Sequence, residues 1–255
     1  MDGRPIGMFD SGFGGISVLA EAARALPDED FLFLGDNLHA PYGDRTPAEV
    51  LAFTRAGVCQ LIDRGAKAIV IACNTATSAA AATLRAELPL PIVGMEPALK
   101  PASQLPGSGT VLVMATTMTL RQEKFLRLME RYGSDAIPVP SPGLVELVEA
   151  GETDGPRMQA FLTQLLHPYL QQPVKAVVLG CTHYLFVRRA IAALLPPPTA
   201  LVDGNAGTVR QLKTLLVQRG LLAPVRTGDR EQVTFLSTSP DPAVPQRMRA
   251  WLASV

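Results

Sequence analysis

The chain has 255 residues, of which 47% are hydrophobic, and its 23 basic and 23 acidic residues give zero formal net charge. This length can bury a full core and allows one or two domains. The zero net charge argues against a general nucleic-acid binder, which needs a basic excess to neutralise phosphates. The 3 cysteines cannot complete a disulfide framework and suit a reducing compartment where thiols stay free.

Targeting and membrane signals are missing from the sequence pattern. Residues 1–9 contain no basic head followed by an apolar stretch, so they do not form a signal peptide. The longest apolar uncharged run, between Lys67 and Arg85, is interrupted by Asn, Thr and Ser. It falls short of the roughly 20 apolar residues that cross a bilayer. We therefore expect a soluble cytoplasmic protein with no membrane partner.

Short apolar runs alternate with amphipathic stretches along the chain. The predicted strands are, in chain order, 5–9, 31–35, 68–72, 91–94, 111–115, 176–179 and 233–236. The predicted helices are 17–26, 47–64, 78–88, 120–132, 156–170, 186–195, 208–219 and 245–253. Continuous apolar strands that alternate with helices predict an α/β fold with mostly parallel sheets flanked by helices.

Two proline-containing segments, 97–109 and 196–205, interrupt this alternation and are predicted to be hinges. A predicted strand is followed by a loop of cysteine and hydroxyl residues at 73–76 and again at 181–183. This repetition indicates a weak internal duplication. We predict two similar lobes, residues 1–96 and 97–205, with residues 206–255 returning to the first lobe. The active site is expected in the cleft between the lobes.

The loops that follow strands are the first candidates for a site, because parallel sheets bind ligands at the carboxyl ends of their strands. Cys73 and Cys181 both stand at such a position, just before a predicted helix. Free N–H groups and the helix dipole at that place favour a thiolate. Cys59 lies inside an amphipathic helix pattern and is expected to be a packing residue.

Other polar residues share these loops. His183 can exchange protons near neutral pH. Asp10 is either the N-cap of the following helix or a partner of a thiol, because Ser11 could serve equally well as the N-cap. The glycine-rich loop after Asp10 lacks a phosphate-binding signature and favours a small anion. Zinc held by Cys73, Cys181, His183 and Asp10, or a redox dithiol, are weaker alternatives, because no C-x-x-C or H-x-x-x-H spacing supports them.

Two thiols on opposite sides of a chiral carbon suggest racemisation, in which one group removes a proton and the other delivers one. Neighbouring Asp and His groups would tune the thiols. The chain shows no cofactor motif and no metal motif, so we expect no cofactor. The carbanion would then be stabilised by positioning, hydrogen bonds and the exclusion of water.

These motifs resemble those of the glutamate racemases in the aspartate/glutamate racemase superfamily, and the resemblance runs nearly end to end. The two cysteine motifs, ACNTA at 72–76 and GCTHY at 180–184, are together highly specific. The other matching segments are FDSGFGG at 9–15, GD at 35–36, PYG at 41–43, LVELVE at 144–149, DG at 203–204 and VTFLSTSPDP at 233–242.

The resemblance implies interconversion of L- and D-glutamate without a cofactor or metal, which supplies D-glutamate for peptidoglycan synthesis. Cys73 would remove the proton from the D-isomer and Cys181 from the L-isomer, assisted by Asp10 and His183 respectively. Glu149 matches a carboxylate near that histidine. The amino and carboxylate groups would be bound by Asp10, Ser11, Tyr42, Gly43, Asn74, Thr75, Thr182 and His183, and the side-chain end by Thr117 and Thr119.

The sequence departs from the family pattern at three places. Glu146 stands where relatives have proline, which leads us to choose Glu149 as the carboxylate. Leu185 replaces a proline after the second cysteine motif, and we expect only a small local change from it. Ser141 replaces a cysteine that is not a catalyst in relatives. Because the chain begins almost at its first strand, we also expect no activation by a cell-wall precursor.

Several alternatives stay open. Aspartate or another amino acid is an alternative substrate, because few side chains set the substrate length. A regulator that binds an amino acid without turnover is a second alternative, against which the intact Asp10, Cys73, Cys181 and His183 argue. No surface patch in the sequence indicates an oligomer, so a homodimer is left open. No nucleic-acid partner is expected.

Overall fold

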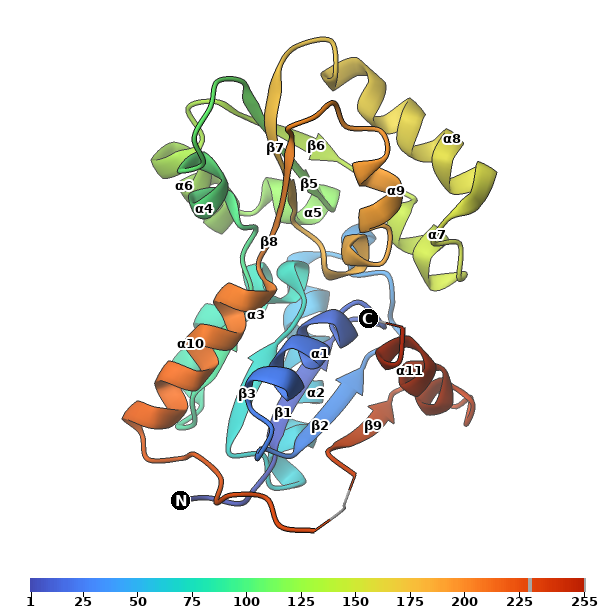
Figure 1. Cartoon of the computed structure of the whole chain (residues 1–255). Helices are drawn as coiled ribbons and strands as arrows, with labels where there is room; N and C mark the ends of the chain where they lie inside the picture. Colours follow the sequence, from blue (N-terminus) through green and yellow to red (C-terminus); the bar gives the residue numbers. More distant parts are fainter. Residues whose placement is uncertain (229–230, 255) are drawn as a thin grey trace. The chain divides into compact units, whose positions relative to one another are not determined.

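The computed structural model describes residues 1–228 and 231–254 (Figure 1). The chain divides into two compact units, one made of Met1–Met95 and Asn205–Val255 and the other of Glu96–Gly204. The lobe bounds expected from the sequence differ from these by one residue. Each unit contains a single parallel sheet flanked by helices, which confirms the α/β fold class.

The first unit contains a five-stranded parallel sheet in the order β4-β3-β1-β2-β9. Its strands read as apolar runs because helices cover both faces, so that even alternate residues are buried. The strands are β1 (Ile6–Asp10), β2 (Phe31–Gly35), β3 (Ala68–Ile71), β4 (Ile92–Gly94) and β9 (Val233–Ser237).

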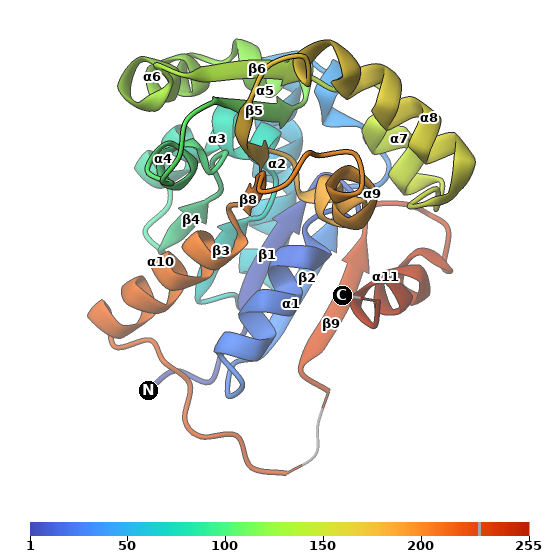
Figure 2. The same cartoon turned by 45° about the horizontal axis from the view of Figure 1, so that its top comes forward.

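Helices α1, α10 and α11 lie on one face of this sheet, and α2 and α3 lie on the other (Figures 1 and 2). They are α1 (Ile16–Ala25), α2 (Pro47–Asp63), α3 (Asn74–Glu87), α10 (Asn205–Gln218) and α11 (Val244–Leu252), with a 3₁₀ turn η1 (Tyr42–Asp44). Helix α2 begins where the sequence predicts it, because Thr46 and Glu49 form a reciprocal capping box around Pro47.

The second unit has a four-stranded parallel sheet in the order β6-β5-β7-β8. Its strands are β5 (Thr110–Ala115), β6 (Ala136–Pro140), β7 (Val174–Leu179) and β8 (Ala200–Asp203). Its helices are α4 (Leu99–Ser103), α5 (Thr117–Arg121), α6 (Glu123–Tyr132), α7 (Leu144–Glu149), α8 (Gly155–Leu166) and α9 (Arg188–Ala192), with 3₁₀ turns η2 (His167–Tyr169) and η3 (Thr182–Leu185).

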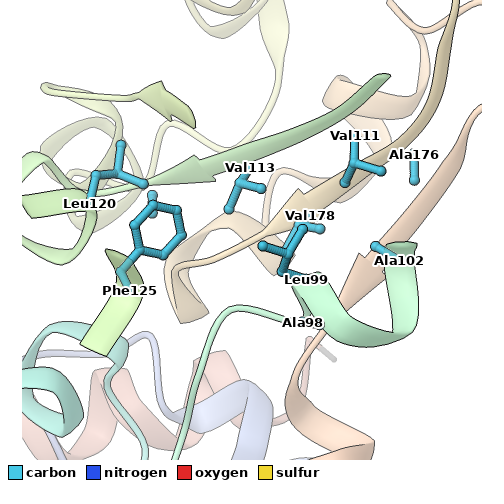
Figure 3. Packing of buried hydrophobic residues seen from close by; sticks show 10 residues of the cluster. Ala98, Leu99, Ala102, Val111, Val113, Leu120, Phe125, Ala176 and Val178 are labelled. Carbon is cyan, nitrogen blue, oxygen red and sulfur yellow. The ribbon is translucent and has the colours of Figure 1, made fainter. Parts of the chain in front are cut away.

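The core of the second unit packs one face of its sheet against helices α4 and α6. On one face of the sheet, alternate residues of β5 and β7 point toward α4 and α6 (Figure 3). Val113 and Val178 lie in this layer with Leu99 of α4 and Phe125 of α6, and all four are buried. Fully burying side chains of this size contributes about 1.5–3 kcal/mol each. This layer therefore stabilises the packing of α4 and α6 against β5 and β7.

The two sheets share one topology, in which the first four strands of each unit lie in the order second, first, third, fourth. Their registers also correspond. Phe9 pairs with Ile71 and accepts a 2.7 Å bond from the N–H of Ala72, whereas Met114 pairs with Leu179 and accepts a 2.7 Å bond from the N–H of Gly180. The residue after each donor is a cysteine. Cys73 and Cys181 therefore occupy equivalent positions, beyond the third strand of each sheet.

The predicted strand and helix list needs several corrections. Strands β6 and β8 are absent from the predicted strands, and β8 lies inside residues 196–205, which were predicted to be a hinge. Both are edge strands, where the two prolines of β6 are tolerated and where apolar patterning is weak. Residues 97–109, also expected to be a break, contain α4, and the family segment 144–149 forms α7.

Some predicted helices have different bounds. The predicted helix 120–132 is two helices, α5 and α6, because Gln122 has an extended backbone between them. Helices α3 and α10 begin three to four residues earlier than predicted, at Asn74 and Asn205. No helix within residues 1–228 and 231–254 combines the length and the apolar character needed to cross a membrane.

Candidate active site

Cys73 lies directly beyond β3 and is the N-cap residue of α3. Its sulfur accepts a hydrogen bond from the N–H of Ala76 at 3.4 Å, and the hydroxyl of Ser11 lies 3.4 Å from the same sulfur. The thiol is buried, as is Ser11. Because a helix N-terminus favours negative charge, the N–H of Ala76 would stabilise this sulfur in its thiolate form.

Asp10 ends β1 and is fully buried. Its carboxylate accepts a 2.8 Å bond from the N–H of Gly12, which folds the glycine-rich loop back over the strand end. The N-cap residue of α1 is Gly15, so neither Asp10 nor Ser11 caps this helix, contrary to the simpler expectation from the sequence. A Cβ on Gly15 would lie 2.8 Å from the Cβ of Asp10, so only glycine lets the loop approach so closely.

Asn74 and Thr75 form the first turn of α3 and are buried. Neither the amide nitrogen nor the amide oxygen of Asn74 has a hydrogen-bond partner among the residues that the structure describes. Buried polar groups are nearly always hydrogen-bonded in folded proteins. The amide of Asn74, which comes next to the Cys73 thiol in the chain, therefore fits a group that binds the polar atoms of a small ligand.

Tyr42 and Gly43 lie in the 3₁₀ turn η1. The Tyr42 hydroxyl is buried and donates a 2.6 Å hydrogen bond to Asp36. Burial and this bond raise the pKa of Tyr42 above its ordinary value, so the hydroxyl stays protonated. Because the hydroxyl is held by Asp36, the contacts expected from this turn would come from the backbone of Tyr42 and Gly43.

The second thiol has a different environment. Cys181 is buried and has the same extended backbone as Cys73, with φ and ψ of −140° and 137° compared with −131° and 124°. It is followed by the 3₁₀ turn η3, and the predicted helix starts later, as α9 at Arg188; the Cys181 side chain makes no cap hydrogen bond. Its sulfur lies 3.7 Å from Nδ1 of His183. A histidine therefore takes the place of the helix N-terminus beside this thiol.

His183 connects Cys181 to Glu149. Its Nε2 lies 2.6 Å from a carboxylate oxygen of Glu149, the last residue of α7. Burial by itself would lower the pKa of His183, but its bonds to Cys181 and Glu149, and their charges, raise that pKa well above its usual value. The imidazole is thus held as a cation that can donate to the sulfur. Glu146 is exposed, so the carboxylate that meets His183 is Glu149.

The threonines of the second unit differ in their surroundings. Thr116 is the N-cap of α5, where its hydroxyl accepts from the N–H of Thr119 at 3.2 Å and donates to the Thr119 hydroxyl at 2.9 Å. Thr119 is fully buried, whereas Thr117 is half-buried. Thr182 begins η3 and is also buried. The structure thus brings Thr119 together with Thr116, which was not among the predicted site residues.

The family model described as Asp/Glu/Hydantoin racemase matches residues 14–212, which is most of the chain. The chain belongs to the Asp/Glu/hydantoin racemase family. A glutamate racemase of Clostridium perfringens is 50% identical over 220 residues, which cover 85% of each chain. These similarities make the protein an amino-acid racemase.

Solved racemase structures share the fold. Glutamate racemase RacE1 from Bacillus anthracis matches with a TM-score of 0.88 and 29% identity, over 99% of this chain and 95% of that one. The Escherichia coli glutamate racemase, solved in complex with L-glutamate and the activator UDP-MurNAc-ala, matches with a TM-score of 0.85 and 31% identity, over 98% and 95% of the two chains.

The third cysteine of this racemase is not where the sequence analysis expected it. Cys59 lies on α2 but is exposed, so it is not a packing residue. The buried face of α2 is formed by Val50, Thr54, Gly57, Val58 and Leu61. Because successive helix residues are about 100° apart, the residue after Val58 turns away from the core. Local apolar neighbours in sequence were a misleading signal here.

The strand registers of the two sheets identify Thr116 as a candidate site residue, which the sequence motifs did not. The N–H of Asp36 donates to the carbonyl of Asp10, and in the second unit the N–H of Ser141 donates to the carbonyl of Ala115. Asp10 and Ala115 are therefore equivalent, and so are the residues that follow them, Ser11 and Thr116.

Across residues 1–228 and 231–254, no three His, Cys, Asp or Glu side chains are grouped so that they could hold a metal ion.

Proposed function

We propose that this racemase interconverts L- and D-glutamate by a two-base mechanism that uses Cys73 and Cys181. The observation that carries the proposal is the equivalence of the two thiols, each placed beyond the third strand of its sheet and each beside its own donor. Glutamate is favoured because the relatives are glutamate racemases, and the Escherichia coli enzyme was solved with L-glutamate.

In the proposed reaction, one cysteine acts as a thiolate and takes the proton from Cα of the amino acid. The electron pair of the broken C–H bond stays on the substrate as a carbanion. The other cysteine, which is a thiol, then gives its proton to the opposite face of the same carbon and becomes a thiolate. The configuration is inverted, one proton has been exchanged, and the roles of the thiols are reversed for the back reaction.

The surroundings of the two thiols support complementary roles. Cys73 is stabilised as a thiolate by the first turn of α3 and by Ser11, and we assign Asp10 to assist it. Cys181 is assisted by His183, whose charge is supported by Glu149. We propose that Cys73 acts on the D-isomer and Cys181 on the L-isomer. Because both proton carriers are side chains, the reaction needs no cofactor.

The polar groups near the thiols are proposed to hold the amino acid. The amide of Asn74 and the hydroxyls of Ser11, Thr75 and Thr182 are buried polar groups of the kind that bind amino and carboxylate groups. Thr117 and Thr119 are assigned to the side-chain end of the substrate. The cellular role that follows is the supply of D-glutamate for peptidoglycan.

Incubation of the purified protein with L-glutamate in heavy water tests the proposal. We expect optical rotation to decay toward zero while deuterium enters Cα, because every inversion exchanges the Cα proton. Aspartate and a panel of other L-amino acids run in parallel show whether glutamate is preferred. Absence of both exchange and rotation change would overturn the proposed activity, and faster turnover of aspartate would overturn the substrate assignment.

Substitution of the cysteines tests the mechanism. We expect Cys73→Ala and Cys181→Ala each to lower the racemisation rate by at least about 100-fold, since loss of a general acid–base group removes about 10²–10⁴-fold of rate. Cys59→Ala is the matched control, because Cys59 is exposed on α2, and it should keep the wild-type rate. Substantial activity in either of the first two variants would contradict the two-base assignment.

A further inference from the structure

Asp36, the first residue beyond β2, is a buried carboxylate to which the proposed mechanism gives no role. One of its oxygens accepts a 2.6 Å bond from the Thr238 hydroxyl, and the other accepts a 2.6 Å bond from the Tyr42 hydroxyl. Nδ1 of His39 lies 2.8 and 3.0 Å from the two oxygens. The backbone N–H of Asp36 donates to the carbonyl of Asp10 at 2.9 Å. Asp36 therefore joins the loops that follow β1, β2 and β9.

Thr238 follows β9 and lies in the segment 233–242, which resembles the family but to which no role was assigned. Besides donating to Asp36, its hydroxyl accepts from the N–H of Leu38 at 3.1 Å. Its own N–H donates to the carbonyl of Gly35 at 3.2 Å. These contacts join positions about 200 residues apart, and they arise because β2 and β9 are neighbours in register. The C-terminal segment thus fixes the start of the loop after β2.

Tyr42 is the residue through which this arrangement reaches the proposed substrate contacts. Its ring packs against Phe9 and Phe53, with centroids 6.5 and 6.1 Å away, and its hydroxyl is held by Asp36. The position of the η1 turn, and of the Tyr42 and Gly43 backbone, therefore depends on where the Asp36 carboxylate is held.

We propose that Thr238 and Asp36 are positioning residues, which set the η1 turn so that its backbone binds the amino acid. This inference rests on the proposed function and on the substrate contacts that the family resemblance implies for Tyr42 and Gly43. Thr238 acts through Asp36, and Asp36 acts through the Tyr42 hydroxyl. The bound groups would be those that both enantiomers share, the α-amino and α-carboxylate groups.

Steady-state kinetics in both directions test the proposal with three variants. Thr238→Val removes the hydroxyl while keeping the shape. We expect it to raise KM about five- to tenfold for both enantiomers, which matches one lost hydrogen bond. Because this binding is uniform between ground state and transition state, kcat should change by less than about twofold. Thr238→Ser, which keeps the hydroxyl, should restore a KM near that of the wild type.

Ser237→Ala is the matched control. Ser237 is the last residue of β9 and precedes Thr238, and its hydroxyl donates to Oδ1 of Asn37 at 2.9 Å and accepts from the N–H of Ser239 at 3.0 Å. We expect its KM to equal that of the wild type. A KM in Thr238→Val that equals that of the wild type, an equal rise in Ser237→Ala, or no rescue by Thr238→Ser would each overturn the positioning role.

Hydrogen–deuterium exchange gives a second measurement that needs no substrate. The backbone amides of residues 42–46 include the N–H of Arg45, which donates to the carbonyl of Tyr42 at 3.2 Å. In the ligand-free protein, we expect these amides to exchange faster in Thr238→Val than in the wild type or Ser237→Ala. Unchanged exchange would overturn the inference. If the wild type failed to racemise glutamate, the proposed function would fail, while this measurement would still decide the positioning role.

Discussion

At the scale of single residues, the two thiols show how one chemical group can be prepared in two ways. Cys73 has a helix N-terminus and a serine hydroxyl, whereas Cys181 has a histidine whose charge is supported by a carboxylate. A helix N-terminus has a fixed electrostatic effect, whereas a histidine adds a group that itself titrates. The environment of Cys181 is therefore the part of the site that should depend on pH.

The pair of His183 and Glu149 gives a prediction for stability. Because the pKa of His183 is raised in the folded protein, its stabilising effect is complete below the unfolded pKa of about 6.5 and is lost as pH rises through the folded pKa. Glu149→Gln removes the charge that supports the imidazolium. We expect this variant to be less stable than the wild type by about 1–3 kcal/mol at pH 6.

Urea unfolding of both proteins between pH 5.5 and 9 measures this difference. The gap in the free energy of unfolding should narrow as pH rises, because the wild-type imidazole then loses its proton. A gap that stays constant over the whole range would show that Glu149 does not stabilise a charged His183.

At the scale of the elements, glycines decide how closely helices approach the first sheet. Gly57 lies on the buried face of α2, and a Cβ there would meet the ring of Phe9 at 2.3 Å. Gly207 in α10 is exposed, and a Cβ there would meet only the end of Arg210 at 3.8 Å. Identical residues therefore serve opposite purposes, one permitting contact between α2 and β1 and the other only weakening a helix.

Alanine at these two positions should have opposite effects on stability. Gly57→Ala is expected to destabilise the protein by about 1–3 kcal/mol, because a packed core does not accommodate an added methyl group. Gly207→Ala is expected to stabilise it by up to about 1 kcal/mol, through the higher helix propensity of alanine. Thermal unfolding measures both changes. Stabilisation by Gly57→Ala would mean that α2 can move away from β1.

At the scale of the whole molecule, the first unit is assembled from two distant parts of the chain. Strand β9 pairs with β2, and a buried ion pair between Lys67 and Glu29 provides a second link. Lys67 lies 2.5 Å from Glu29, and Glu29 also accepts from the N–H of Ala223 at 2.9 Å. Lys67 further donates to the carbonyl of Asp2. These contacts fasten the C-terminal segment to the N-terminal part of the unit.

Breaking this ion pair on one side should be more harmful than removing both charges. Lys67→Met leaves the Glu29 carboxylate buried and uncompensated, which is expected to cost about 3–5 kcal/mol of unfolding free energy. The double variant Lys67→Met/Glu29→Gln removes the second charge and keeps an acceptor for Ala223, so it should be more stable than the single variant. Chemical denaturation measures this, and a double variant that is less stable still would refute the assignment of a buried charge penalty.

The strand-and-loop pattern, with the loops that carry the two cysteines, follows from local sequence signals. It does so because buried parallel strands are short apolar runs and because the chemistry of each loop is contiguous in the chain. Edge strands β6 and β8 were not predicted, since two prolines interrupt β6 and the short β8 follows a run of three prolines. The exposure of Cys59 and the 3₁₀ turn after Cys181 also could not be read locally.

The contacts between groups that are distant in the chain follow from the fold. The contact of His183 with Glu149 depends on where α7 ends relative to η3, and the contact of Thr238 with Asp36 depends on β9 pairing beside β2. Strand register and helix packing set such contacts, and neither is encoded by the propensity of the residues that touch. The sequence therefore determined which side chains carry the chemistry, and the fold decided which partners hold them in position.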